Sequence, residues 1–363
     1  MYTHPVERST SHILLQSLAF LSLCLLLVGC DITINGSEIG GSTNGGSGAS
    51  CQSNCALGSG INGVEVYVEP DNGEGVITNA IHDAHKSVWL EMYLLTDTNV
   101  IHALEDATNS GIDVRVMLEP HPYGESASAA RTLDELRAAD IKAQDTDPAF
   151  TLTHEKGMII DGKTAYIMTS NFTRSALGGS SGTTNREYGI IDTNSQDVQA
   201  IIAIFNADWN HTTTQFHDPN LVVSPVNSRS AFISLIGSAH HTLLIEAEEM
   251  QDSSIESALI SAARHSVKVE VILPPSSSSS GSSNDQGIAT ISQAGVQVRE
   301  DPRLYMHAKI IIVDGKKAFV GSENISSQSL DENRELGIIV SDAGVLSKLA
   351  STFQTDWGDS RAA

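Results

Sequence analysis

One motif occurs twice in this chain, and that repeat constrains the fold more than any other feature. The first copy begins at His154-Glu-Lys156 and reaches Asn171, and the second begins at His307-Ala-Lys309 and reaches Asn324. In both, four mostly apolar residues lead from Lys to an Asp-Gly pair, and the Asn follows a second apolar run. The repeat predicts a body built from two similar halves.

Each copy is predicted to form a β-hairpin. Asp-Gly between two apolar runs favours a type I′ turn, which needs a positive φ at both central residues. With Asp161-Gly162 as a two-residue loop, His154 lies opposite Thr169, and Lys156 lies opposite Ile167. Side chains alternate between faces along a strand. One face of each hairpin is therefore expected to carry His154, Lys156, Thr169 and Asn171 in the first copy, and His307, Lys309, Ser322 and Asn324 in the second.

This set of side chains is suited to binding phosphate. Lysine supplies a positive charge with three donors, asparagine an amide donor, and histidine a group that titrates near neutral pH. A duplicated domain that has lost activity is the alternative, but packing alone does not require these residues at the polar end of a hairpin. Asp161 and Asp314 lie in the turns and are predicted to be structural.

Strand and helix patterns repeat as well. Strands alternating with helices predict an α/β fold: a duplicated mixed-sheet sandwich of two pseudo-twofold halves, 64–220 and 221–363, with helices on the outer faces. The matched segments are strands 88–92 and 243–247, helices 99–109 and 253–264, strands 114–118 and 269–273, helices near 127–139 and 285–294, and terminal helices ending at Trp209 and Trp357.

The first residues are typical of an export signal. The apolar run 13–28 is short for a membrane span, and Leu27-Val-Gly-Cys30 resembles the lipobox of bacterial lipoproteins. We expect a signal peptide over 1–29, a lipid-modified Cys30, and a protein anchored to the bacterial cell envelope on its periplasmic or extracellular face. An ordinary signal peptide or an uncleaved anchor are the alternatives.

Residues 30–63 are rich in Gly and Ser and are predicted to be a tether that reaches roughly 30 Å. Cys51 and Cys55 lie in it. Outside the cytosol they are expected to pair with each other, since a metal site would need two further ligands.

The charge balance is strongly acidic, with a formal net charge of -23. Because nonspecific nucleic-acid binding depends on cationic surface, this balance disfavours a nucleic-acid partner. Solubility, or adaptation to a salty medium, explains the acidity equally well.

A further matched pair follows the hairpins: Asn185-Arg-Glu187 and Asn333-Arg-Glu335. A carboxylate at this place is predicted to accept the second ring N–H of each histidine, which fixes the tautomer and raises the basicity of the ring. Surface ion pairs are the alternative reading.

Together, the doubled His-x-Lys…Asp…Gly-Ser-x-Asn pattern and the trailing Asn-x-Glu resemble the phospholipase D superfamily, over residues 64–357. The second copy matches throughout, whereas Met168-Thr169 stands where the first would have Gly-Ser. The resemblance implies that His154 attacks phosphorus and His307 is the acid/base. It also implies that neither a metal nor another cofactor is required. Charge on the phosphate would be stabilised by Lys156, Lys309, Asn171 and Asn324, with Thr169 and Ser322 as further phosphate-binding groups.

The expected function is a phosphodiesterase that hydrolyses phospholipid head groups or exchanges them for an alcohol, on a membrane to which the lipid anchor holds it. Because both half-sites lie in one chain, a monomer suffices. Two alternatives stay open: an endonuclease of the same superfamily, and a catalytically silent lipoprotein that binds phosphate-bearing ligands.

Overall fold

The computed structural model describes residues 49–51, 57–123, 125–179, 183–275 and 283–363. One compact unit, Gly45–Ala363, contains both halves. The predicted signal peptide, Cys30, most of the tether, Cys55 and the side chain of Cys51 lie outside the described residues. No helix among the described residues combines the length and the apolar character needed to cross a membrane.

The first half forms a mixed sheet in the order β14-β8-β7-β6-β3-β4-β5, with β2 also paired to β8. A short parallel pair joins β1 (Ala49–Cys51) to β9 (Thr214–Phe216). The elements of this half are β2 (Glu65–Glu69), α1 (Gly75–His82), β3 (Ser87–Met92), α2 (Thr98–Asn109), β4 (Asp113–Leu118), α3 (Ser126–Ala138), β5 (Lys142–Asp145), β6 (Lys156–Ile160), β7 (Thr164–Met168), β8 (Asn185–Asp192) and α4 (Ser195–Trp209).

The second half repeats this plan in a sheet of order β10-β17-β16-β15-β11-β12-β13-β18. Its elements are β10 (Leu221–Ser224), α5 (Ser228–Gly237), β11 (Thr242–Ala247), α6 (Ser253–Arg264), β12 (Lys268–Leu273), α7 (Asp285–Ser292), β13 (Gln297–Glu300), β14 (Tyr305–Met306), β15 (Lys309–Val313), β16 (Lys317–Gly321), α8 (Ser327–Asp331), β17 (Glu335–Val340), α9 (Ala343–Asp359) and β18 (Arg361–Ala362).

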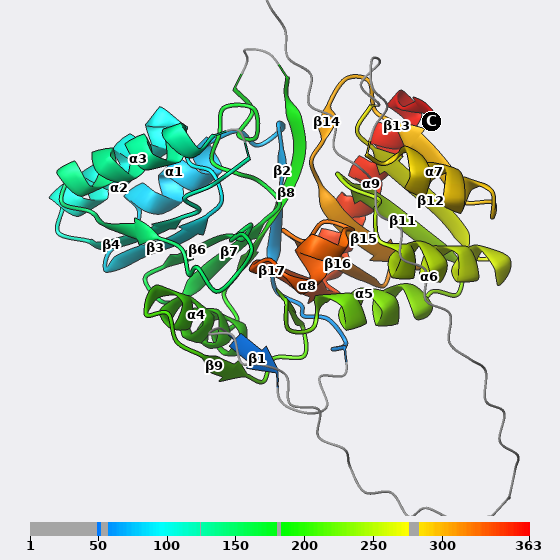
Figure 1. Ribbon diagram of the computed structural model, residues 1–363, viewed down its shortest axis with the longest axis horizontal. Coiled ribbons are helices and arrows are strands. Elements are labelled where there is room, and N and C mark those ends of the chain that lie inside the picture. Colours follow the sequence, from blue (N-terminus) through cyan, green and yellow to red (C-terminus); the bar gives the residue numbers. More distant parts are fainter. Residues whose placement is uncertain (1–48, 52–56, 124, 180–182, 276–282) are drawn as a thin grey trace, which may run out of the picture. The chain divides into compact units, whose positions relative to one another are not determined.

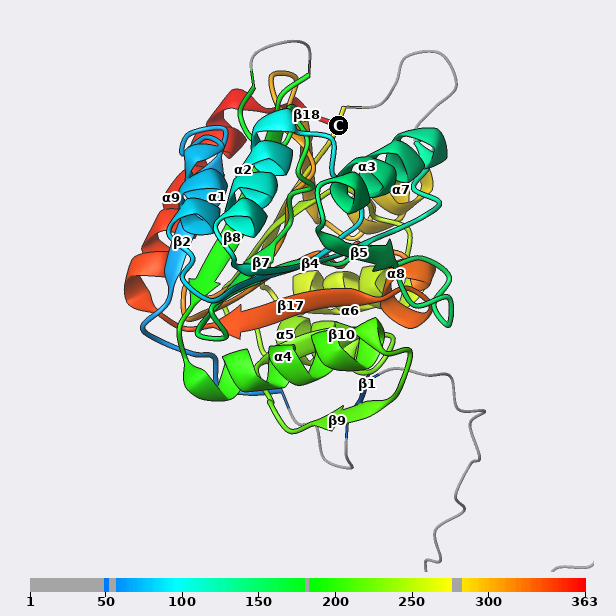
Figure 2. The same ribbon diagram turned by 90° about the vertical axis from the view of Figure 1, so that its left-hand side faces the viewer.

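Three apolar clusters hold the layers together. Helices α1 to α3 lie against the sheet of the first half, and α5 to α7 lie against that of the second (Figure 1). A third cluster combines the inner faces of both sheets with α4 and α9, which Figure 2 shows from the side. Apolar residues thus face inward from both halves, and the predicted duplicated α/β sandwich is confirmed.

Matched capping residues start equivalent helices in the two halves. The Asp97 side chain accepts the backbone N–H of Asn99 and Val100 at the start of α2. Asp252 does the same for Ser254 and Ile255 at the start of α6. Each carboxylate satisfies N–H groups that have no partner within the helix.

Both predicted hairpins are present, but the predicted register is wrong by one residue. Asp161 and Gly162 have positive φ, as do Asp314 and Gly315, and Lys163 N–H closes the first turn on the Ile160 carbonyl. However, Ile160 pairs with Thr164, so Gly157 rather than Lys156 lies opposite Ile167.

The turn aspartates explain the displaced register. Asp161 donates its backbone N–H to the Ser87 carbonyl, and its carboxylate accepts the N–H groups of residues 85–87. Asp314 makes the equivalent bonds to residues 240–242, and Val313 pairs with Lys317. The turn is therefore bound to the loop before the neighbouring strand, and one more residue stays out of the ladder. This supports the predicted structural role of both aspartates.

Candidate active site

A single cleft of about 620 Å³ receives residues from both halves. Both motif histidines and both motif asparagines lie in its wall, so the structure brings the two predicted half-sites together. The lining comprises Tyr93, Tyr123, Leu152, His154, Asn171, Glu248, Glu249, Gln251, His307, Asn324, Ser326, Ser327, Gln328, Ser329 and Asn333.

The backbone of each half crosses to the other at this cleft. Just before His307, β14 pairs in parallel with the start of β8 in the first half. Just before His154, Thr153 forms a parallel bridge with Arg334 of the second half, and the His154 N–H donates to the Arg334 carbonyl. Each histidine segment is thereby fixed beside the Asn-Arg-Glu segment of the opposite half.

This crossing pairs each histidine with the carboxylate of the other half. His154 Nδ1 lies 3.1 Å from both oxygens of Glu335, and His307 Nδ1 lies 2.7 Å from Glu187 Oε1. Both carboxylates are fully buried. A carboxylate at Nδ1 fixes the orientation of the ring and leaves Nε2 for chemistry.

Hydrogen bonds in turn hold the two glutamates. Glu187 accepts from Thr169 Oγ1 at 2.6 Å and from Asn185 Nδ2 at 3.0 Å. Glu335 accepts from Ser329 Oγ at 2.7 Å and from Asn333 Nδ2 at 3.3 Å. The repeated asparagines thus orient the glutamates that orient the histidines.

The two motif lysines lie buried beneath the cleft. Lys156 Nζ donates to the His154 carbonyl at 2.6 Å, and Lys309 Nζ donates to the His307 carbonyl at 2.7 Å. Lys156 also faces the Tyr93 ring, with Nζ 5.2 Å from the ring centroid. Each motif lysine is thus bound to the backbone of the histidine two residues before it.

Burial changes the protonation of these groups. It lowers the pKa of Lys156 to about 7, against the attraction of Glu335 and with added repulsion from Lys309. Burial also lowers the pKa of His154, which Glu335 partly restores. Burial alone would raise the pKa of Glu335, but His154 and Lys156 hold it below its usual value. At neutral pH the site thus combines a neutral His154 with an ionised Glu335.

Comparison with known proteins agrees with this geometry. A family model described as the cardiolipin synthase, phospholipase D-like domain matches residues 77–209 and 232–357. The chain belongs to the phospholipase D superfamily. The major cardiolipin synthase of Bacillus subtilis (strain 168) is 26% identical over 349 residues, covering 82% of this chain and 71% of that protein. A cardiolipin synthase of Oceanobacillus iheyensis is 24% identical over 342 residues, covering 81% and 68%.

Two solved structures share the fold of this superfamily member. The phosphatidylserine synthase of Haemophilus influenzae Rd KW20 aligns with a TM-score of 0.63 at 12% identity, over 83% of this chain and 87% of that one. A polyphosphate kinase from Porphyromonas gingivalis aligns with a TM-score of 0.61 at 17% identity, over 81% of this chain and 50% of that one. At these identities the likeness concerns the fold alone.

Both motif hydroxyls lie behind the cleft wall. Thr169 Oγ1 accepts the Tyr188 N–H and donates to Glu187, while Ser322 Oγ accepts the Leu336 N–H. Both hydroxyls thus join neighbouring strands of their own half, Thr169 also holds Glu187, and neither residue lines the cleft. Met168, the departure from the superfamily pattern, is fully buried in the apolar cluster beneath α1 to α3 and does not line the cleft.

Sequence reasoning missed Glu248, a carboxylate in the second half-site. Its Oε2 lies 2.8 Å from Lys309 Nζ, 3.3 Å from Asn324 Nδ2 and 3.4 Å from His307 Nε2. Burial alone would raise its pKa, but His307 and Lys309 hold it well below the usual value. The matched residue in the first half is Tyr93, whose ring lies edge-on to His154 at 4.6 Å. Aligning the two repeats residue by residue would have exposed this difference.

Proposed function

We propose that this protein is a phosphodiesterase of phospholipase D type that transfers phosphatidyl groups from phospholipids to water or to an alcohol. The observation that carries the proposal is the shared cleft, which is lined by an imidazole from each half whose Nδ1 lies beside a buried carboxylate of the opposite half. The relatives support a phospholipid substrate, because they are named as synthases of phospholipids.

The surroundings of the two rings support different roles. His154 has an aromatic ring on one side and a single carboxylate at Nδ1, which suits a neutral nucleophile. His307 has a carboxylate near each ring nitrogen, which hinders its Nε2 as a nucleophile toward an anionic phosphodiester and suits it better to proton transfer. We therefore assign His154 as the nucleophile and His307 as the acid/base.

The reaction then runs in two displacements. His154 Nε2 attacks phosphorus and the bond to the head-group oxygen breaks, while His307 gives its proton to that oxygen. His307 next takes a proton from water or an alcohol, whose oxygen attacks the phosphohistidine and releases His154. Lys156, Lys309, Asn171 and Asn324 would stabilise the nonbridging oxygens, so that protein cations carry the charge stabilisation.

A finer question is whether water or an alcohol accepts the phosphatidyl group. Hydrolysis would yield phosphatidic acid, and an alcohol such as glycerol would yield a new phospholipid. Most residues that line the cleft have polar side chains, and the segment around α8 offers hydroxyl and amide groups that suit either acceptor. Product analysis with and without added glycerol would distinguish them.

The test uses the full chain in detergent with vesicles of phosphatidylglycerol or phosphatidylcholine, in the presence and absence of EDTA. We expect head-group release in both buffers, and acid-labile phosphate trapped on His154. His154→Ala and His307→Ala should each lose turnover by at least about 100-fold, since a positioned acid or base contributes about 100- to 10,000-fold. Label on neither histidine contradicts the mechanism; degradation of DNA in place of lipid shows a nuclease, and no turnover shows a silent binding protein.

We also infer that a lipid anchor at Cys30 brings the cleft to its substrate. The export-signal pattern and the Leu27-Val-Gly-Cys30 sequence support this inference. Labelling with a fatty acid in growing bacteria should mark the wild-type protein and fail to mark Cys30→Ala. Equal labelling of both would contradict it.

A further inference from the structure

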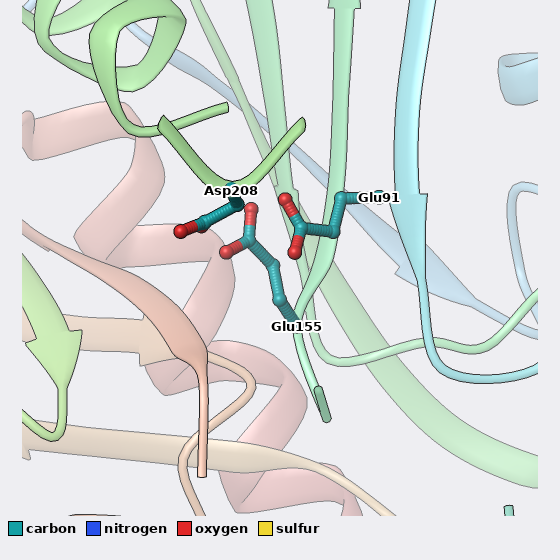
Figure 3. A group of neighbouring side chains, drawn as sticks. All are labelled: Glu91, Glu155 and Asp208. Carbon is teal, nitrogen blue, oxygen red and sulfur yellow. The ribbon is translucent and has the colours of Figure 1, made fainter. Parts of the chain in front are cut away.

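Three carboxylates gather below the cleft in the first half. Glu91 comes from β3, Glu155 from the residue between His154 and Lys156, and Asp208 from the end of α4. Figure 3 shows the carboxylates of Glu91 and Glu155 beside each other, with Asp208 next to Glu155. All three are buried, and one oxygen from each lies within 4.8 Å of the others.

Glu91 has no hydrogen-bonding partner in this cluster. Its side chain is 1% exposed, and neither of its oxygens accepts a hydrogen bond from the described residues. Glu155 Oε2 is likewise unpaired among them. Leaving a buried carboxylate without a partner costs several kcal/mol, so the arrangement points to a positively charged occupant.

Arg334 compensates only part of this charge. Its Nε and Nη2 lie 2.9 and 3.0 Å from the two oxygens of Asp208, and its Nη1 donates to the Ser224 carbonyl. The described contacts thus give Asp208 a cationic partner and give none to Glu91. The charge of Arg334 acts on all three carboxylates and that of Lys156 acts on Glu155, but neither cation hydrogen-bonds Glu91.

The matched network around Glu246 gives its glutamate a hydrogen-bond partner. There, Arg186 binds Asp356 with two hydrogen bonds, whereas Arg334 makes one hydrogen bond and one further ionic contact to Asp208. Glu246, which matches Glu91, accepts a 2.6 Å hydrogen bond from Tyr188 Oη. The matched residues of the first half differ at three places.

Each of the three differences removes a neutral partner or filler from the surroundings of Glu91. Leu336 replaces the tyrosine, Glu155 stands where the second half has Ala308, and Gly157 stands where it has Ile310. A Cβ on Gly157 would lie only 2.6 Å from Glu155 Oε1. The glycine therefore makes the space into which the Glu155 carboxylate turns.

We propose that Glu91, Glu155 and Asp208 form a binding site for one divalent cation of the size of Ca²⁺. The donors are all carboxylate oxygens, which hard cations prefer. Ca²⁺ binds oxygen at about 2.3–2.6 Å, so two of its ligands lie up to about 5 Å apart, and three oxygens that all lie within 4.8 Å of one another are close enough to share one such ion. The ion would fix the segment that carries His154 and Lys156, and it would not contact the phosphorus.

The test measures Ca²⁺ binding to the full chain in detergent after removal of metals with a chelator. Isothermal titration with CaCl₂ should show one tight site, and saturating CaCl₂ at about 100 times Kd should raise the melting temperature by about 5 °C. Glu91→Gln and Glu155→Gln should weaken binding at least tenfold and remove most of the thermal shift. Glu246→Gln changes the matched glutamate of the second half and should retain both.

Three results would overturn the proposal. One is a wild-type protein that shows no Ca²⁺ binding in the calorimetric titration. Another is Ca²⁺ binding by Glu91→Gln and Glu155→Gln that equals binding by the wild type, since it would place the ion on the acidic surface. The third is a wild-type melting temperature that CaCl₂ does not change, together with a higher melting temperature in Glu155→Gln than in the wild type above pH 8. This result would mean that Glu91 and Glu155 share a proton. Because binding and melting are measured without substrate, these results are independent of phospholipid turnover.

Discussion

The crossed pairing of histidines and carboxylates predicts that changing Glu335 alters His154, which belongs to the other half. In Glu335→Gln the side chain keeps its size and loses its charge. Burial already lowers the pKa of His154, and Glu335 is the strongest influence that opposes this lowering. Removing the charge should therefore lower the pKa of His154 further.

The magnitude follows from the contact. Both oxygens of a fully buried Glu335 lie 3.1 Å from His154 Nδ1, and a hydrogen bond to a charged group contributes about 1.5–3 kcal/mol. At 1.36 kcal/mol per pH unit, the pKa of His154 should fall by about one to two pH units. If the same energy is lost from the transition state, kcat should fall about 10- to 150-fold.

Histidine NMR measures this directly. The His154 signal is assigned by its loss in His154→Ala and is then titrated in wild type, Glu335→Gln and Glu187→Gln. Glu187→Gln is the matched control, because its carboxylate contacts His307, and it should leave the titration midpoint of His154 in place. An unchanged midpoint in Glu335→Gln, or a midpoint displaced by Glu187→Gln instead, would refute the crossed assignment.

Three further substitutions test other parts of the site. Lys156→Met should abolish head-group release yet raise the melting temperature by several degrees at pH 6, because the buried ammonium, with its pKa lowered to about 7, destabilises the fold most below that pH. The gain in melting temperature should shrink toward pH 9. A gain that stays constant with pH would show that the charge of Lys156 is not its cause. Glu248→Gln should lower KM for an anionic phospholipid severalfold, because Lys309 and Asn324 no longer bind an internal carboxylate; a raised KM would mean that Glu248 contacts substrate favourably. Burial raises the pKa of Glu246 to about 8, so the proton that stabilises the folded state is lost as the pH rises toward 8. Glu246→Gln should therefore show a smaller fall in melting temperature between pH 5 and 9 than the wild type. The same fall in both proteins would show that other acidic groups cause it.

Local patterns predicted much of this fold because they are local in origin. The matched apolar periods placed the helix over residues 253–264 and the one ending at Asn109 where the structure has them. The Asp-Gly pairs predicted both turns with positive φ. The repeat itself predicted two similar halves, and each half contains an equivalent sheet.

The errors arose where distant segments decide the local structure. The hairpin register depends on N–H groups of residues 85–87, which bind the Asp161 carboxylate and hold the turn away from a simple two-residue loop. No pattern within the hairpin carries that information. The exchange of partners between halves was similarly hidden, because Thr153 and Arg334 meet only after both sheets have formed.

The two halves differ most where their functions would be expected to diverge. Near the cleft, an aromatic ring beside His154 is matched by a carboxylate beside His307, so the two imidazoles face different fields although they occupy equivalent positions. Below the cleft, the cluster of three carboxylates found among the described residues lies next to the strand that presents His154. A symmetric pair of histidines cannot by itself choose which one attacks phosphorus. The asymmetry of the surrounding residues supplies that choice, because it favours a neutral ring at His154 and places two carboxylates around His307.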